Sequence, residues 1–301
     1  MSHRQAVRSA LRVNEGMGVL FTRLGSRQHP RGAVWAAYVR ATRQLRDILA
    51  SGPGSVGRPA RAISSVQVAQ AGEVLRQLRL DVALSVQPVL QDAAALGTLQ
   101  ALAQLRAYGL TPPGSAMPPA SEAQAGLQAV LATVDLQVAA ATALLVTGAQ
   151  PEMITGTDER QGPLSAAAVI SPATLWVGAA ALAGWGWAVG LYGGRPGPQP
   201  WLKQAVAAID ERTTECCLRV HGQVVPLDGV FHLTGQPRFA EYKEAPPFHW
   251  RCRTATALVR PEDAGDGLTQ EMVDAARAEL LARAATGVRV EIDPASATSR
   301  R

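Results

Sequence analysis

Histidine and cysteine are rare in this chain, and most of them lie in two short stretches of its last third. The 301 residues include five His and three Cys. The stretch "DERTTECCLRVHGQVV" contains Cys216, Cys217 and His221, and the stretch "APPFHWRCR" contains His249 and Cys252. Thiolates and imidazoles are preferred ligands of zinc, and an imidazole can also activate a neighbouring thiol as a nucleophile. The clustering therefore predicts either a metal site or thiol chemistry.

The spacing within each stretch fits a structural zinc site. Three residues separate Cys217 from His221, and two separate His249 from Cys252. Short spacings within a pair and a long loop between the pairs are typical of zinc sites that hold a small domain together. The candidate ligands are therefore Cys217, His221, His249 and Cys252, and His232 in the intervening loop competes for the place of His221.

A second interpretation needs no metal. Cysteine is often buried simply as a small apolar residue, and His249 can be a hydrogen-bonded core histidine. Arg253 is then expected to form an ion pair with Asp210. The adjacent Cys216 and Cys217 would point to opposite faces of a strand, so that only Cys217 would join the cluster. Both interpretations stay open at the level of the sequence.

An enzymatic role is a third interpretation, either as a metal-dependent nuclease or hydrolase or through Cys217 as a nucleophile activated by His249. Two Cys and two His would fill a tetrahedral zinc ion and leave no coordination position for a reacting water. A catalytic thiol also needs a group that orients its base, and Asp210 is the one candidate in the two stretches. The sequence therefore favours a protein without enzymatic activity.

The first half of the chain predicts a set of long helices. Residues 32–50 have the spacing of an amphipathic helix, with one face formed by Val34, Tyr38, Leu45, Ile48 and Leu49. Pro88 suits a first helical turn, and Gly109 suits the position after a helix end. We expect further helices over residues 64–87, 88–108 and 122–147, the last with Ser121 as its N-cap and Gly148 as its stop.

Residues 164–192 carry no charge, and their length alone would permit a membrane span. Two features favour a buried helix from Pro172 to Tyr192 instead. Ser171 and Pro172 interrupt the segment, and its flanks lack a clear cluster of anchoring charges. Ala and Gly also dominate over the larger apolar residues. A membrane-active role of residues 173–192 remains the alternative.

The last third has the pattern of a small mixed domain. Residues 201–209, 217–227 and 253–259 predict short strands, and residues 268–286 predict an amphipathic helix that ends at Gly287. Residues 288–292 predict one more strand. The expected fold class is therefore α+β, with a long-helix N-terminal region followed by a small mixed α/β module with short antiparallel strands.

Positive charge is concentrated at the N-terminus. Residues 1–61 contain eleven Arg against two acidic residues, a balance of +9 in a chain whose net charge is +5. Such a segment is typical of contact with nucleic acid or an acidic surface, and we take as candidates Arg4, Arg8, Arg12, Arg40, Arg43 and Arg46. The alternative is a compositional preference for Arg, since Lys occurs only twice.

The N-terminal sequence and the cysteines agree on a compartment. Residues 1–21 contain no uninterrupted apolar run and several Arg, so we expect no signal peptide. Three clustered cysteines do not have the pattern of a secreted disulfide framework. We expect the chain to be made in a reducing cytoplasm.

The two stretches together resemble the signature of the phage head morphogenesis family, the Mu F-like minor capsid proteins. Members typically show Asp-x-Arg-Thr, a Cys, a Gly that opens a strand, and then Pro-Pro-x-His-x-x-Cys-Arg. The matching positions are Asp210, Arg212, Thr213, Cys217, Gly222, Pro246, Pro247, His249, Cys252 and Arg253. The resemblance covers roughly residues 165–260, and two blocks in the same order are more specific than either alone. Cys216 and His221 depart from the pattern.

The resemblance implies a virion component without enzymatic activity, located inside the capsid near the portal and in the host cytoplasm during assembly. Its implied partners are the portal protein and capsid or scaffold proteins, with a role in head assembly and in DNA packaging or ejection, and it implies no small-molecule substrate. The basic arm is expected to contact DNA or the portal. The chain is expected to comprise a basic helical arm (1–61), a helical region (62–150), the Mu F-like module (164–260) and a C-terminal helix and tail (261–301). A nuclease or hydrolase and a membrane-active ejection protein are the alternatives.

Overall fold

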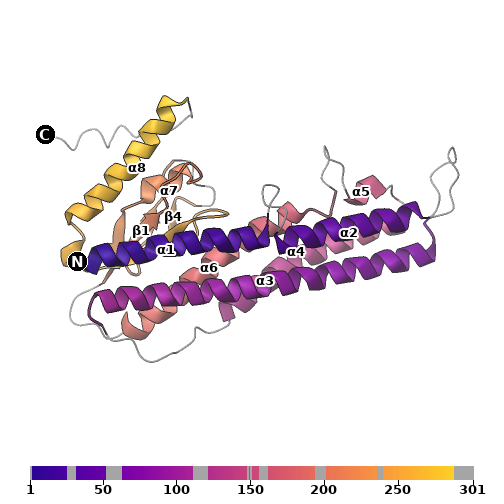
Figure 1. Ribbon diagram of the computed structural model, residues 1–301, viewed down its shortest axis with the longest axis horizontal. Helices are drawn as coiled ribbons and strands as arrows, with labels where there is room; N and C mark the ends of the chain where they lie inside the picture. The colour runs from indigo at the N-terminus through magenta and orange to yellow at the C-terminus, as the bar shows by residue number, and fades with distance from the viewer. Residues whose placement is uncertain are drawn as a thin grey trace. The chain divides into compact units, whose positions relative to one another are not determined.

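The protein is described here by a computed structural model that covers residues 2–25, 32–51, 63–110, 121–147, 149, 151–155, 162–193, 201–235, 237 and 240–287. Its fold class is α+β, as predicted, with long helices and a small region of antiparallel strands (Figure 1). The predicted helix stop at Gly148 and the predicted strand over residues 288–292 lie outside the described residues, as do Arg27, Arg31, Arg58 and Arg61 of the basic segment.

The chain divides into two compact units. Unit 1 is formed by described residues of Met1–Gly18, Ala93–Pro119 and Gly178–Arg301, and unit 2 by those of Val19–Asp92 and Ala120–Val177. Three helices contribute residues to both units, namely α1 (Ser2–Leu24), α3 (Ser65–Ala107) and α6 (Ala166–Gly193). Each unit therefore draws on several of the segments expected from the sequence.

Unit 2 is helical in its described part, with α2 (Ala33–Ala50), α4 (Ser121–Val146), the short α5 (Pro151–Thr155) and parts of α1, α3 and α6. The predicted amphipathic helix over residues 32–50 is confirmed, since Val34, Tyr38 and Leu45 of α2 are buried. The Tyr38 hydroxyl donates to Gln137 Oε1 of α4 at 2.5 Å, and Gln137 Nε2 donates to the Ser165 carbonyl.

Two prolines at which the sequence predicted a helix boundary lie inside continuous helices. The expected boundary between two helices at Pro88 is wrong, because α3 continues through this residue. Pro88 is exposed, whereas Val86, Val89 and Leu90 around it are buried. A proline inside a helix costs about 3 kcal/mol locally, and burial on both sides of it offsets that cost.

The predicted start of a helix at Pro172 is wrong for the same reason, because α6 begins at Ala166. Ser121 is the first residue of α4 rather than its N-cap, a difference of one position. Gly109 has φ of 76° directly after the end of α3, so the predicted left-handed stop is confirmed.

Among the described residues, two helices are long and apolar enough to cross a membrane by length and composition, Ala123–Val146 and Ala166–Val189. The core helices of soluble proteins pass the same test, so this is weak evidence for a span. In α6 half of the apolar window is buried, and in α4 a third. From the sequence, a membrane span was considered for the segment that forms α6 and not for the one that forms α4.

The sheet of unit 1 has three antiparallel strands in the order β2-β1-β5. They are β1 (Leu202–Ala207), β2 (Val224–Pro226) and β5 (Thr254–Val259), and β1 pairs with β5 over its full length. The strands predicted at 201–209 and 253–259 are thus confirmed. The strand predicted at 217–227 is wrong in its first half, because Glu215–Val220 form a short helix, α7. A separate two-stranded sheet joins β3 (Phe231–His232) and β4 (Tyr242–Lys243).

Polar side chains of α3, and Tyr108 just beyond its end, cover the free edge of β5. Gln100 donates to the Thr256 carbonyl at 2.7 Å, and the Tyr108 hydroxyl donates to the Leu258 carbonyl at 2.9 Å. Gln104 lies between them, fully buried, and accepts from the amide of Leu258 at 3.0 Å. An open strand edge carries unpaired backbone groups, and these three side chains satisfy three of them, the Thr256 carbonyl and both backbone groups of Leu258.

Gln104 also joins the helices of unit 1. Its Oε1 accepts from the Trp185 indole of α6 at 2.9 Å, and its Nε2 lies 3.3 Å from the Ala6 carbonyl of α1. The approach of α3 and α6 requires glycine, because a Cβ at Gly97 would lie 1.7 Å from the Ala181 carbonyl oxygen. A Cβ at Gly184 would likewise lie 2.0 Å from the Ala94 carbonyl oxygen.

Residues 2–18 of α1 are an integral part of unit 1. His3 is buried, with Nε2 2.8 Å from Gln204 of β1 and Nδ1 2.7 Å from Asp266. Asn14 donates to the Val206 carbonyl at 2.9 Å. Asp266 in turn caps α8 (Gly267–Ala285) by accepting from the Thr269 amide, so the predicted C-terminal helix is confirmed.

Candidate functional site

The loop between β1 and α7 is held by two arginines from distant parts of unit 1. Both carboxylate oxygens of Asp210 accept from Arg253, at 2.5 and 2.7 Å, so the predicted ion pair is confirmed. Arg283 of α8 donates to the backbone carbonyls of Asp210 and Thr213 at 2.7 and 2.6 Å. The amide of Arg212 closes the loop on Asp210 Oδ1 at 3.0 Å. These contacts fix the entrance to α7.

The ion pair also sets the charge state of Asp210. Burial favours the neutral acid, but hydrogen bonds from Arg253, Arg212 and Thr213 outweigh burial and hold the pKa of Asp210 below its usual value. The carboxylate therefore stays ionised at neutral pH, and the loop remains closed.

Cys216 and Cys217 both contribute to one cluster, which the sequence analysis excluded. They lie in α7, not in a strand, so their side chains are about 100° apart around the helix rather than on opposite faces. The two sulfurs and a ring nitrogen of His249 all lie within 4.8 Å of one another. The prediction that only Cys217 could join was therefore wrong.

A tight turn brings the second stretch to α7. The amide of Cys252 donates to the His249 carbonyl at 3.2 Å, and Arg251 between them has a left-handed φ of 58°. Cys252 Sγ lies 3.8 Å from Cys217 Sγ, so the expected proximity of these two residues is confirmed. His249 Nε2 lies 3.0 Å from Cys217 Sγ and 2.8 Å from the Thr214 hydroxyl.

The tautomer of His249 follows from its other nitrogen. His249 Nδ1 lies 2.6 Å from the Trp250 carbonyl oxygen, which can only accept. Nδ1 therefore carries a proton, and in the neutral ring Nε2 has the lone pair, which can accept from the Thr214 hydroxyl or the Cys217 thiol. A histidine that ligates a metal through one nitrogen usually donates the other to a carbonyl or carboxylate.

His221 has a different role from the one predicted. Its Nδ1 accepts from the amide of Ala207 at 2.9 Å, where the pairing of β1 with β2 has ended. The imidazole is buried, and burial lowers its pKa to about 4, so it is neutral at physiological pH. It extends the hydrogen bonding of β1 and is absent from the cluster of ligand atoms. His232, the competing candidate, is exposed and stacks on Tyr242 with ring centroids 4.8 Å apart.

The remaining motif residues shape the backbone around the cluster. Gly222 has φ of 87°, and a Cβ there would lie 2.9 Å from Val273 Cγ2 of α8, so both conformation and space require glycine. Pro246 and Pro247 are buried and joined by a cis peptide bond. The Pro247 carbonyl accepts from Lys243 at 2.9 Å.

The cluster groups shift one another's pKa. Burial disfavours charge on Cys252, but hydrogen bonds with Cys217 and His249 outweigh it and lower the pKa of Cys252 well below its usual value. Burial also disfavours charge on His249, but contacts with Cys252 and the Trp250 carbonyl raise its pKa. A hydrogen bond with Cys217 lowers the pKa of Cys216 to about 6, and the same contact raises that of Cys217. Cys216 and Cys252 thus favour the thiolate, the form that binds metals, whereas Cys217 favours the thiol.

The burial of the cluster limits its chemistry. Cys216, Cys217 and Cys252 are each at most 2 % exposed, and they belong to a core that includes Phe231 and Phe248. A nucleophile must meet its substrate atom at contact distance, and these sulfurs have no such access. The arrangement therefore suits a structural cluster, either of hydrogen-bonded thiols or of metal ligands.

The predicted contact arginines fall into two groups. Arg4 pairs with Glu271 at 3.2 Å, Arg40 pairs with Asp81 at 2.8 Å, and Arg46 Nε donates to the Thr155 hydroxyl. The second group, Arg8, Arg12 and Arg43, is exposed, and none of them has a side-chain partner in the described part of the chain. Arg4, Arg8 and Arg12 recur every four residues and thus share one face of α1.

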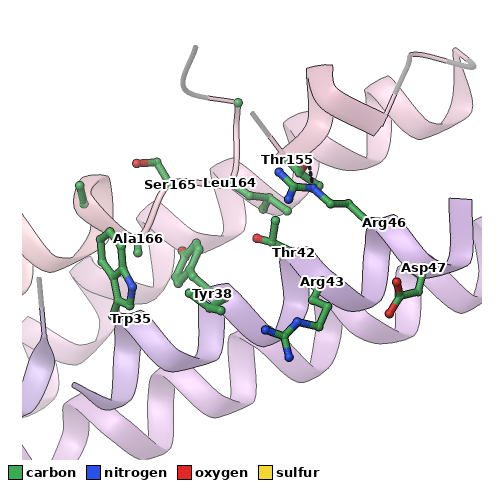
Figure 2. A pocket seen from close by; sticks show the side chains of 13 residues that line it. Trp35, Tyr38, Thr42, Arg43, Arg46, Asp47, Thr155, Leu164, Ser165 and Ala166 are labelled. Atoms are coloured by element: carbon green, nitrogen blue, oxygen red, sulfur yellow. Dashed lines mark hydrogen bonds between the residues drawn. The ribbon is translucent and has the colours of Figure 1, made fainter. Parts of the chain in front are cut away.

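Unit 2 contains a separate pocket of about 400 Å³ between α2, α5 and residues 162–167. Figure 2 shows Trp35, Tyr38 and Arg43 of α2 along it, and the contact of Arg46 with Thr155. This pocket could not be predicted from the sequence, because its residues follow no motif. It combines aromatic walls with two arginines, one of which is already bonded to Thr155.

Some residues of the cluster were missed by sequence reasoning. Thr214 bonds His249, Cys216 supplies a third sulfur, and Arg283 holds the loop. The pair Glu215 and Arg219, spaced i,i+4 and joined at 2.7 Å, was the available sign that this stretch is helical. Comparisons of the chain with protein-family models, curated proteins and solved structures find no match.

Proposed function

We propose that this chain is a minor capsid protein of the phage head morphogenesis type, which acts beside the portal during head assembly and DNA packaging or ejection. The observation that carries the proposal is the meeting of its two sequence blocks. Asp210 of the first block pairs with Arg253 of the second, and Cys217 contacts His249 and Cys252. The residues that carry the family resemblance are thus those that hold one module together, as expected if the resemblance reflects a common module.

The burial of the three thiols supports a protein without enzymatic activity, since a reactive cysteine must be accessible. The exposed Arg8 and Arg12 on α1 supply a basic face for DNA or an acidic portal surface. α1 itself cannot be removed to test this, because residues 2–18 pack into unit 1 through His3 and Asn14.

The assembly role is tested by co-expressing the chain with the portal and major capsid proteins encoded in the same genome. We expect it in the soluble fraction and sedimenting with portal-containing proheads, and lost from proheads that lack portal. Recovery in a membrane pellet that resists high salt and carbonate would instead support the membrane-active alternative. Soluble protein that never sediments with proheads would contradict the proposal.

The basic face is tested by replacing Arg8 and Arg12 with Glu, with Arg79→Glu in unit 2 as a control of equal charge change per site. If the face binds DNA, affinity without sequence preference should fall about tenfold or more between 50 and 200 mM salt. The double variant should abolish it and the control should not. Unchanged DNA binding in the double variant would show that this face of α1 does not bind DNA. If the double variant instead loses prohead binding, the face contacts the portal.

A further inference from the structure

The structure assigns a zinc site formed by Cys216 Sγ, Cys217 Sγ, Cys252 Sγ and His249 Nε2. This set differs from the one that spacing predicted, because Cys216 takes the place of His221. The inference does not depend on the proposed capsid role, and it concerns how the module is held together.

One distance between the ligand atoms matches a tetrahedral ion, and the remaining side chains must move to reach that geometry. Cys252 Sγ contacts Cys217 but lies outside the group in which the ligand atoms of Cys216, Cys217 and His249 are all within 4.8 Å of one another, so zinc must draw it closer. With zinc–sulfur bonds of about 2.3 Å, two sulfurs of a tetrahedral site lie about 3.8 Å apart. Cys217 Sγ and Cys252 Sγ lie 3.8 Å apart, at 35 residues' separation in the sequence. With a zinc–nitrogen bond of about 2.0 Å, each sulfur should lie about 3.5 Å from the ring nitrogen. The observed 3.0 Å between Cys217 Sγ and His249 Nε2 must therefore lengthen by about half an ångström, a small side-chain rotation.

The surroundings of the ligands are those of a metal site. His249 is oriented by its Nδ1–H bond to the Trp250 carbonyl, which leaves Nε2 as the ligand atom. The Thr214 hydroxyl lies 3.3 Å from Cys216 Sγ and can donate to a metal-bound thiolate there. Three thiolates and one imidazole make a soft donor set, which favours zinc over hard cations such as magnesium or calcium.

The alternative for the fourth ligand is excluded by what His221 already does. Its Nδ1 accepts from the Ala207 amide, and a zinc ion on that nitrogen would leave the buried amide without a partner. In the neutral ring Nε2 then carries the proton and has no lone pair to offer a metal. The structure thus gives a closed, four-ligand site with no position left for a substrate.

The first test uses the wild-type chain, so that folding of a variant cannot confuse it. Protein expressed in zinc-supplemented medium and purified without metal-affinity steps should contain about one zinc per chain. X-ray absorption at the zinc edge should give three sulfur and one nitrogen ligand, with bonds near 2.3 and 2.0 Å. Two sulfurs and two nitrogens would restore the set predicted from spacing and overturn this assignment, and so would metal-free protein whose stability does not change on adding zinc.

The second test separates Cys216 from His221. Cys216→Ser should lower zinc affinity by about 100-fold or more, since even the partners of metal ligands are worth 10–100-fold. His221→Asn, which can still accept from the Ala207 amide, should retain zinc at full stoichiometry. Cobalt substitution gives a readout of geometry: the visible bands of a tetrahedral thiolate site should weaken in Cys216→Ser and stay in His221→Asn. The reverse result in the two variants would overturn the assignment.

Discussion

The two units of the molecule bury polar groups very differently. Of fifteen buried polar or charged side chains among the described residues, three lie in unit 2, namely Gln137, Thr155 and Thr174. The other twelve lie in unit 1. A buried polar group is stable only if a particular partner stands at the right distance, whereas apolar packing tolerates substitution of similar volume. Unit 1 should therefore be specified by individual hydrogen bonds, and unit 2 by the pattern and volume of its apolar faces.

The largest effect that separates the units is expected at Gln104. Replacing it with Leu would leave the Trp185 indole and the Leu258 amide without their acceptor, both in buried surroundings. At about 1–3 kcal/mol for each unsatisfied group, we expect the free energy of unfolding to fall by about 3–5 kcal/mol. Gln128→Leu on the exposed face of α4 is the matched control, with an expected change within about 0.5 kcal/mol. Urea denaturation measures the unfolding free energy of both variants. Equal losses of stability would contradict the difference between the two units.

The next effect concerns pH. Burial lowers the pKa of His221 to about 4, below its unfolded value of about 6.5. The stability that this depressed pKa represents is present above pH 6.5 and is lost as the pH falls toward 4, because the unfolded state then binds a proton that the folded state does not. The shift corresponds to about 3 kcal/mol over this window.

His221→Asn isolates this contribution, since the difference in unfolding free energy between wild type and variant should shrink steadily from pH 6.5 to 4. The variant must be compared with wild type because His249 acts in the opposite direction. Its pKa is raised, so the stability that it contributes is lost as the pH rises through its folded pKa. The described part of unit 2 contains no histidine, so its helices should keep their stability across the window. A constant difference between wild type and variant would contradict a buried neutral imidazole.

A smaller effect on the free energy of unfolding is expected when a glycine is replaced with alanine. Its sign should be opposite at one glycine in unit 1 and one in unit 2. Gly222→Ala places a Cβ on a residue with φ of 87° and against Val273, and should cost about 1–3 kcal/mol. Gly72→Ala in α3 meets nothing within 4 Å and should stabilise the helix by about 0.5–1 kcal/mol. Thermal and urea unfolding of the two variants check the signs. Destabilisation at both positions would contradict the difference in packing.

These differences also explain what the sequence could and could not predict. The helix α2 follows from its apolar periodicity, and β1 and β5 follow from short runs of β-formers, because these patterns record which face is buried. The ends of other helices follow from breakers such as Gly109. The helix boundaries predicted at Pro88 and Pro172 were wrong. A proline inside a helix costs about 3 kcal/mol, and burial of the helix on both sides of the proline outweighs this cost.

The cluster was predicted in part. Two blocks with reactive residues implied that Cys217, His249 and Cys252 lie together, and the ion pair of Asp210 and Arg253 followed from charge and motif. The place of Cys216 could not be predicted, because it depends on α7 being a helix of six residues, too short to show a period. The bond of His221 to a strand amide is equally invisible in the sequence, since it depends on where β2 ends.

The smallest effect is expected at ion pairs on the surface of unit 2. Arg79 and Asp135 lie 2.6 Å apart but are 42 % and 50 % exposed, so water and salt screen their attraction. A double-mutant cycle to Ala should give a coupling of about 0.5 kcal/mol or less, and less still in 1 M salt. Asp210 is 40 % exposed, but Arg253 is only 23 % exposed and donates to both carboxylate oxygens, so the same cycle on this pair should give about 1–2 kcal/mol. If Arg79 and Asp135 couple as strongly as Asp210 and Arg253, individual polar contacts specify unit 2 as well, and the distinction between the units fails.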